Sequence, residues 1–125
     1  MIAGVGNDII EIHRIEKAVS KNDRFILRNF TKREQDYFRR RNNSYETIAG
    51  NFAAKEAVSK ALGTGFKGFD LVDVEVIRDE EGAPLVCLHG KAREISKEKN
   101  IGKIWVSISH CKEYASAVAI AEKGL

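Results

Sequence analysis

The sequence predicts an α+β fold, in which antiparallel hairpins and grouped helices, one of them long, build a single domain over residues 1–125. Three patterns support this prediction. Residues 1–12 alternate with a period of two, as in a strand, and helical periodicity follows. Two pairs of strand-like segments then lie at 72–88 and 104–122. Because helices and strands are grouped and do not alternate, a doubly wound parallel sheet is not expected.

The first strand places Gly4, Gly6 and Asp8 on one face. Glycines in a strand leave room for another chain or a ligand to approach the backbone closely. An acid within an apolar strand is most often an edge-strand charge. The alternative for Asp8 is a role as a cation ligand.

Four helices are expected, and two of them have clear end signals. Thr31 and Glu34 fit a capping box, and Gly63 fits the glycine that follows a helix C-terminus. The expected helices are 11–20, 32–40, 45–62 and 91–99. The expected strands after the helices are 72–78, 85–88, 104–110 and 114–122.

The length and composition limit which classes of protein are possible. A chain of 125 residues with 43% hydrophobic residues supports one core but cannot enclose a large ligand by itself, so a site shared between subunits is plausible. No apolar run approaches the roughly 20 residues that span a bilayer, and no secretory signal is recognisable, so we expect a cytoplasmic protein without a membrane partner.

Cys87 and Cys111 are expected to be reduced thiols, partly buried in strands.

The positive charge is concentrated near the N-terminus. The net charge is +3, but residues 14–41 contain ten basic and four acidic residues. This segment lacks a base-stacking pattern and any RNA-recognition signature, so a nucleic acid partner is not expected. An acidic protein or a phosphorylated cofactor is the better partner.

The long helix at 45–62 divides into two arcs. One arc is mostly alanine, and the other carries Lys55, Glu56, Ser59 and Lys60, which we expect to form a polar face. Glu56 and Lys60 are i, i+4 neighbours, and such a pair is usually solvated. The alanines nevertheless let the helix pack tightly, and tight packing can hold a carboxylate in place as a metal ligand.

Two carboxylates from different elements, together with lysines, suit Mg²⁺, which also takes phosphate oxygens and waters. This combination would serve phosphoryl-type transfer.

His110 ends a strand, where a histidine is commonly structural. Ser109 and His110 point to opposite faces of that strand and no G-x-S-x-G elbow is present, so a serine hydrolase is not favoured. The glycines at 63–68 lack the P-loop frame.

Three blocks of residues together resemble the holo-(acyl-carrier-protein) synthases, a family of 4′-phosphopantetheinyl transferases. They are GVGNDIIEI at 4–12, FAAKEAVSKALGTG at 52–65 and VSISH at 106–110. The blocks stand in the family's order, and the resemblance covers essentially the whole chain. The resemblance implies the phosphopantetheinyl transferase-like fold. It also implies transfer of the phosphopantetheine arm from coenzyme A to a serine of apo acyl carrier protein, with release of adenosine 3′,5′-bisphosphate, in support of fatty acid biosynthesis.

The resemblance also implies roles for individual residues. Asp8 and Glu56 match the Mg²⁺ ligands, and Lys60 matches a lysine near the transferred phosphate. Glu56 is the implied base for the carrier serine, acting directly or through a metal-bound water. His110 matches the histidine that contacts the coenzyme A phosphates. The implied cofactor-lining residues are Ser59, Lys60, Gly63, Gly65, Ser109 and His110.

Two features of assembly follow from the same resemblance. The family docks acidic carrier proteins on its basic first helix, and its short members are homotrimers with active sites at subunit interfaces. The implied carrier contacts are Arg14, Lys17, Lys21 and Arg24. Many members have a basic residue where this chain has Asn51, so the resemblance does not imply a cofactor phosphate contact at this position. Lys55 and Lys67 are the candidate replacements.

Two other functions fit part of the pattern. A non-catalytic module that binds an acidic protein through residues 14–41 explains the charge distribution but not Asp8, Glu56 and His110 together. A Mg²⁺-dependent nucleotide hydrolase shares the metal site, but it would break down coenzyme A without a carrier protein.

Overall fold

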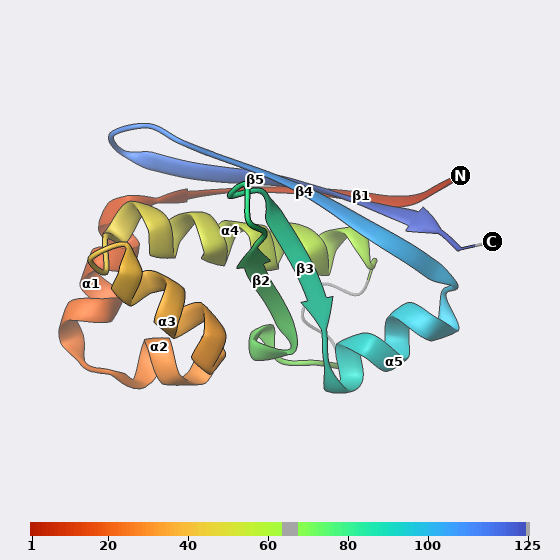
Figure 1. The fold of residues 1–125 in the computed structure, drawn as a ribbon, viewed down its shortest axis with the longest axis horizontal. Helices are drawn as coiled ribbons and strands as arrows, with labels where there is room; N and C mark the ends of the chain where they lie inside the picture. The colour runs from red at the N-terminus through yellow and green to blue at the C-terminus, as the bar shows by residue number, and fades with distance from the viewer. Residues whose placement is uncertain (64–67, 125) are drawn as a thin grey trace.

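The computed structural model describes residues 1–63 and 68–124 and confirms an α+β architecture. Figure 1 shows strands β1, β5 and β4 as one layer, with helix α4 running beneath it. Helices α1 to α3 cluster at one end of α4, and α5 lies at the other. The elements are β1 (Ile2–Glu11), α1 (Ile12–Lys21), α2 (Arg24–Asn29), α3 (Lys32–Arg40), α4 (Tyr45–Ala61), the 3-10 turn η1 (Leu71–Asp73), β2 (Val74–Arg78), β3 (Pro84–Leu88), α5 (Gly90–Glu98), β4 (Ile101–His110) and β5 (Tyr114–Lys123).

The central strand β5 pairs antiparallel with β1 on one side and β4 on the other. Positions 115, 117, 119 and 121 of β5 are all alanine and are buried. These small side chains allow α4 to lie close to the sheet. A Cβ atom at Gly6 would lie 2.0 Å from the Ala57 carbonyl oxygen, so the approach of β1 to α4 requires glycine. The open glycine face predicted for the first strand is therefore filled by α4.

Two groups of buried side chains support this arrangement. The main core lies between α4, the three-stranded sheet and the antiparallel β2–β3 hairpin, where Val74 and Val76 are fully buried. The second core joins α1, α2, α3 and the start of α4, and the rings of Phe30 and Phe38 meet in it edge to face at 4.9 Å. None of the described helices has the length and apolar run needed to cross a bilayer.

The helix end signals are confirmed. The Glu34 backbone N–H donates to Thr31 Oγ1 at 3.3 Å, and the Thr31 backbone N–H donates to Glu34 Oε1 at 2.9 Å. These two bonds form the capping box of α3. Gly63 has a φ of 78°, as expected for the residue that follows the C-terminus of α4.

Several expected features are corrected. Helix α2 was not predicted. It is only six residues long, and Asp23 at its N-terminus makes no capping hydrogen bond. Val72 lies in η1 and not in a strand, since the chain makes one 3-10 turn before the hairpin. Strand β4 begins at Ile101, earlier than expected, across an irregularity in its pairing with β5. Cys111 is exposed just after β4, whereas Cys87 is partly buried in β3.

The predicted polar arc of the long helix is wrong at two positions, because Lys55 and Ser59 are fully buried. Lys55 Nζ donates to Glu34 Oε1 at 2.7 Å and to the Val74 carbonyl oxygen at 2.7 Å. Ser59 Oγ donates to the Lys55 carbonyl oxygen at 3.0 Å. Strand β2 contacts both α4 and α3 and covers this side of the helix, so Lys55 and Ser59 face the protein interior.

Candidate active site

Asp8, Glu56 and Lys60 meet where β1 crosses α4. Lys60 Nζ donates to Asp8 Oδ1 at 3.2 Å and to the Asn7 carbonyl oxygen at 3.0 Å. The Asp8 side chain is 14% exposed and that of Lys60 is 50% exposed. Glu56 lies one helical turn before Lys60 and feels the charges of both Asp8 and Lys60. The structure therefore brings together the two carboxylates and the lysine that the sequence assigned to one site.

Glu56 carries a perturbed carboxyl group. Burial raises the pKa of Glu56, the Asp8 carboxylate raises it further, and Lys60 lowers it. Because two carboxylates share one lysine, the cluster has an excess negative charge when both are ionised. Glu56 also lines a hollow of about 600 Å³ together with Arg28 and Asn29 of α2, and it can be reached from the surface there.

This pair of carboxylates fits Mg²⁺. Carboxylate oxygens are preferred Mg²⁺ ligands, and protein sites for this ion commonly supply only one or two of them. Within residues 1–63 and 68–124, no group of three or more His, Cys, Asp or Glu side chains forms a metal cluster. Asp8 and Glu56 would accordingly leave positions for phosphate oxygens and waters.

His110 lies at the opposite edge of the sheet. Asp8 pairs with Ala117 of β5, which pairs with Ile108 of β4, so His110 is two residues farther along the far strand. His110 lines a separate hollow of about 280 Å³ with Thr47 and other residues at the start of α4. Within one chain, the structure does not bring His110 to the Asp8–Glu56 pair.

The other predicted cofactor residues are dispersed. Ser109 is exposed on the outer face of β4, opposite the face of His110. The Ser59 hydroxyl is buried and donates to a backbone carbonyl. Gly63 is exposed at the end of α4, and Gly65 lies outside the described residues. Their contacts with the cofactor stay predictions.

Arg78 also lines the hollow of His110, and it was not identified as a site residue from the sequence. Its Nη2 donates to Asn51 Oδ1 at 2.8 Å, and Asn51 Nδ2 donates to the Val76 carbonyl oxygen at 3.0 Å. Lys55 cannot replace a basic residue at position 51, because it is buried and paired with Glu34. Lys67 lies outside the described residues. No spacing signal could have linked Arg78 to Asn51, since only the packing of β2 on α4 joins them.

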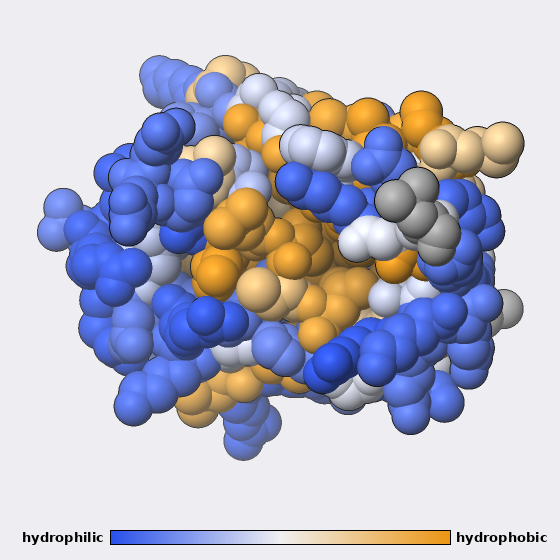
Figure 2. Space-filling model, turned by 45° about the vertical axis from the view of Figure 1, so that its right-hand side comes forward, coloured by the Kyte–Doolittle hydropathy of each residue, from blue (hydrophilic) through white to orange (hydrophobic). Residues whose placement is uncertain are grey.

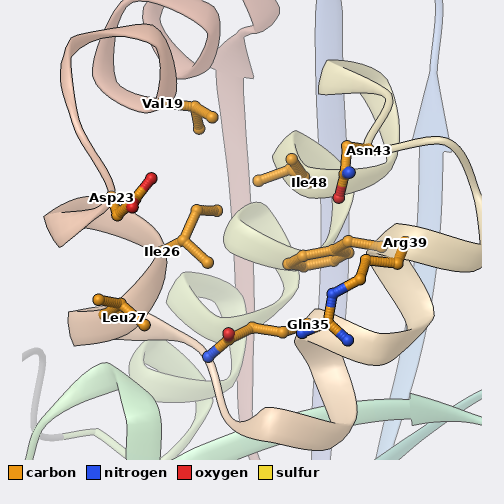
Figure 3. Close-up of a pocket in the computed structure, with 9 residues that line it drawn as sticks. Val19, Asp23, Ile26, Leu27, Gln35, Arg39, Asn43 and Ile48 are labelled. Atoms are coloured by element: carbon orange, nitrogen blue, oxygen red, sulfur yellow. The ribbon is translucent and has the colours of Figure 1, made fainter.

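The basic surface spans two helices. Arg14, Lys17 and Lys21 are exposed on α1, and Arg24 is exposed at the start of α2. A hollow of about 480 Å³ lies among α1, α2, α3 and the start of α4, with the side chains of Ile26 and other residues around it (Figure 3). None of the predicted site residues lines this hollow, so it is not the candidate active site.

Comparison with known proteins identifies the family. The sequence profile of the 4′-phosphopantetheinyl transferase superfamily matches residues 4–119. The chain belongs to this superfamily. A holo-[acyl-carrier-protein] synthase of Clostridium botulinum, strain Alaska E43, is 53% identical over 122 residues, which is 98% of each chain.

Solved structures show the same relationship. The Helicobacter pylori holo-[acyl-carrier-protein] synthase in complex with coenzyme A has a TM-score of 0.84 and 34% identity, over 94% of this chain and 99% of that one. The Bacillus anthracis holo-(acyl-carrier-protein) synthase in complex with CoA (3′,5′-ADP) has a TM-score of 0.80 and 37% identity, over 99% of both chains. The resemblance, the fold and the enzyme class predicted from the sequence are thereby confirmed, and a non-catalytic binding module is not favoured.

Proposed function

We propose that this protein transfers the 4′-phosphopantetheine arm of coenzyme A to a serine of apo acyl carrier protein, in a Mg²⁺-dependent reaction that supports fatty acid biosynthesis. The observation that carries the proposal is the meeting of Asp8, Glu56 and Lys60 at the crossing of β1 and α4. Relatives named holo-[acyl-carrier-protein] synthase, one of them in complex with coenzyme A, support the choice of substrates. The cytoplasmic location stays a prediction.

In this reaction, the carrier serine oxygen attacks the phosphorus that bears the pantetheine arm. A phosphorus–oxygen bond forms to the serine, the bond to the bridging diphosphate oxygen breaks, and adenosine 3′,5′-bisphosphate leaves. Glu56 accepts the serine proton, directly or through a water. Lys60 offsets negative charge that develops on the transferred phosphoryl group.

Asp8 and Glu56 would hold the Mg²⁺ ion, which would neutralise charge on the diphosphate. Their placement supports this role because the two carboxylates repel each other and share one lysine. A cation bound between them would relieve that repulsion.

The carrier protein is proposed to dock on α1 and α2. Arg14, Lys17, Lys21 and Arg24 are exposed there, and Leu27, which is 64% exposed, offers an apolar contact beside them. The hollow that reaches Glu56 is lined by Arg28 of the same helix α2. A carrier bound on this surface would therefore have its serine close to the proposed base.

We also propose a homotrimer with active sites at the subunit interfaces. The outer face of the sheet is apolar, with Val5 59%, Ile9 65% and Trp105 51% exposed. Figure 2 shows apolar surface along the upper edge, where the sheet lies. In addition, His110 and the Asp8–Glu56 pair lie at opposite edges of the sheet, and within the described residues His110 and Glu56 line no common hollow, which supports a site that His110 of a second chain completes.

The reaction is tested by intact-mass spectrometry of apo acyl carrier protein after incubation with this protein, coenzyme A and Mg²⁺. We expect the carrier to gain the mass of phosphopantetheine and the gain to disappear with EDTA. No gain with several carriers, while the protein remains folded, would contradict the proposed function. Breakdown of coenzyme A without a carrier would favour the nucleotide hydrolase instead.

Carrier docking is tested by charge reversal. Arg14→Glu with Arg24→Glu should raise the KM for the carrier and flatten its dependence on salt, because exposed charges act mainly on the encounter. The matched control is Arg93→Glu with Lys97→Glu, which reverses two exposed charges on α5 at the far end of the molecule. An equal change in both double variants would place the carrier elsewhere.

The composite site is tested by mixing subunits. Glu56→Gln and His110→Ala should each inactivate the enzyme, and co-assembly of the two should restore about a quarter of the activity by random pairing at each interface. A mixture no more active than either variant, or a monomer by light scattering, would contradict the shared site.

A further inference from the structure

We propose that Arg78 supplies the phosphate contact that Asn51 cannot make, and that it binds the 3′-phosphate of coenzyme A in the hollow lined by His110. This inference rests on the proposed function, because it concerns the same co-substrate. It assigns a binding residue on β2 that no motif of the sequence contains.

The Arg78 guanidinium is fixed in place but incompletely paired. Its Nη2 donates to Asn51 Oδ1 at 2.8 Å, and its central carbon lies 4.7 Å from the centre of the Tyr37 ring. Its Nη1 is buried and has no hydrogen-bond partner within residues 1–63 and 68–124. Native proteins retain few buried donors without acceptors, because each one costs free energy. A phosphate oxygen is a negatively charged hydrogen-bond acceptor, which is the kind that a guanidinium group prefers.

The surroundings of Arg78 favour an anion. Arg41 and His110 line the same hollow, whose volume of about 280 Å³ has room for a phosphate monoester. Burial lowers the pKa of Arg78, the Tyr37 hydroxyl and the Glu34 carboxylate oppose this shift, and the Arg41 charge adds to it. Glu46 is the carboxylate among the described lining residues, and it is exposed at the start of α4. Two guanidinium groups and an imidazole therefore face a single carboxylate.

The geometry points to the 3′-phosphate and not to the diphosphate. The diphosphate contains the bond that breaks, so it must lie at Asp8 and Glu56. Among the described residues, the hollow of Arg78 and His110 shares no lining residue with the hollow that Glu56 lines, so the two hollows would hold different phosphates of coenzyme A. The remaining phosphate of coenzyme A is the 3′-monoester. Asn51 then acts as a positioning residue, because its bond to the Val76 carbonyl holds its oxygen against Arg78.

The test compares coenzyme A with dephospho-coenzyme A, which lacks the 3′-phosphate. Arg78→Met keeps an unbranched side chain over Tyr37 but removes the guanidinium. We expect this change to raise the KM for coenzyme A roughly ten- to a hundredfold with little change in kcat, and to leave the KM for dephospho-coenzyme A within about twofold. The matched control is Arg40→Met, because Arg40 also lies over the Tyr37 ring, at 5.9 Å, but does not line the hollow.

An equal rise in the KM for coenzyme A and for dephospho-coenzyme A, or no rise in the KM for coenzyme A, would overturn the assignment. Calorimetric binding of adenosine 3′,5′-bisphosphate and of AMP provides a readout that needs no transfer reaction, so it separates this inference from the proposed function. If Arg78→Met weakens the binding of the bisphosphate but not that of AMP, the assignment is supported. If the wild type and Arg78→Met bind the bisphosphate equally well, it is contradicted. Arg78→Lys, which retains the charge, should weaken bisphosphate binding less than Arg78→Met does. An equal loss of bisphosphate affinity in the two variants would also contradict the assignment.

Discussion

Two lysine–carboxylate pairs extend from α4, with their lysines five residues apart, and they differ in burial and in charge balance. Lys55 and Glu34 lie 2.7 Å apart, and both side chains are fully buried. Lys60 and Asp8 lie 3.2 Å apart, with side chains 50% and 14% exposed. Lys55 also donates to two backbone carbonyls, and Glu34 accepts from two backbone N–H groups, so each charge is fully matched. Lys60 instead lies beside two carboxylates.

This difference separates a structural pair from a functional one. Burial raises the pKa of Glu34 and lowers that of Lys55, and the hydrogen bonds between them oppose both shifts. The buried pair therefore ties α3 and β2 to α4 without any charge left to bind a ligand. At the exposed pair, Glu56 adds a carboxylate that no second cation offsets among the described residues. Charge imbalance at an accessible position is what marks the candidate site.

Neutralising the carboxylates beside Lys60 should have the largest effect. Asp8→Asn or Glu56→Gln should lower kcat at least about a hundredfold, because the diphosphate loses its counter-charge. The free energy of unfolding should change by less than about 1 kcal/mol, since each substitution also removes the repulsion between the two carboxylates, and Lys60 is half exposed. Transfer assays and urea unfolding measure the two quantities. Glu98→Gln, an exposed carboxylate on α5, is the control. Turnover like that of the wild type in both variants would remove the metal site.

The buried pair should respond in the opposite way. Lys55→Met should lower the free energy of unfolding by about 3–5 kcal/mol, because it leaves Glu34 buried without its partner. Urea unfolding measures the loss, and Lys60→Met is the matched control with an expected change below about 1 kcal/mol. Adding Glu34→Leu to Lys55→Met should restore part of the stability. Equal effects of the two lysine substitutions would mean that burial does not distinguish the pairs.

A smaller effect is expected at Glu75, a buried carboxylate on β2 beside this network. Burial raises the pKa of Glu75, but hydrogen bonds from Arg33, Thr31 and His89 outweigh it and hold the pKa at about 2, below its ordinary value of 4.5. Between these two pH values the unfolded chain binds more protons, so the contribution of Glu75 is present above pH 4.5 and is lost as the pH falls towards 2.

Glu75→Gln isolates this contribution. The difference in unfolding free energy between the wild type and the variant should be at most about 3 kcal/mol at neutral pH and should shrink as the pH falls through this window. Urea unfolding at several pH values measures it. A difference that stays constant from pH 6 to pH 2.5 would show that the Glu75 charge does not contribute.

The exposed pair was easier to predict from the sequence than the buried one. Asp8 is conspicuous as an acid between glycines, and the spacing of Glu56 and Lys60 places them on one face of a helix. The burial of Lys55 depends on β2, which lies about twenty residues farther along the chain, so the periodicity of one helix cannot contain it. Arg78 escaped prediction for the same reason, because only the packing of β2 on α4 places it against Asn51.

The fold shows the same limit. The periodicity predicted the strands and the long helix, and the capping box predicted the start of α3. The glycines of β1 indicated a close approach, but they could not say that α4 makes it. Helix α2 is held by tertiary packing of partly buried residues such as Phe25, and the Asp23 side chain at its N-terminus makes no capping hydrogen bond.

The proposed metal site is tested directly by a calorimetric titration of Mg²⁺ into the protein in the presence of coenzyme A. The wild type should bind the ion, Asp8→Asn and Glu56→Gln should lose most of that affinity, and Glu98→Gln should keep it. Unchanged Mg²⁺ binding by Asp8→Asn and Glu56→Gln would contradict the claim that the unbalanced carboxylates on β1 and α4 form the metal site.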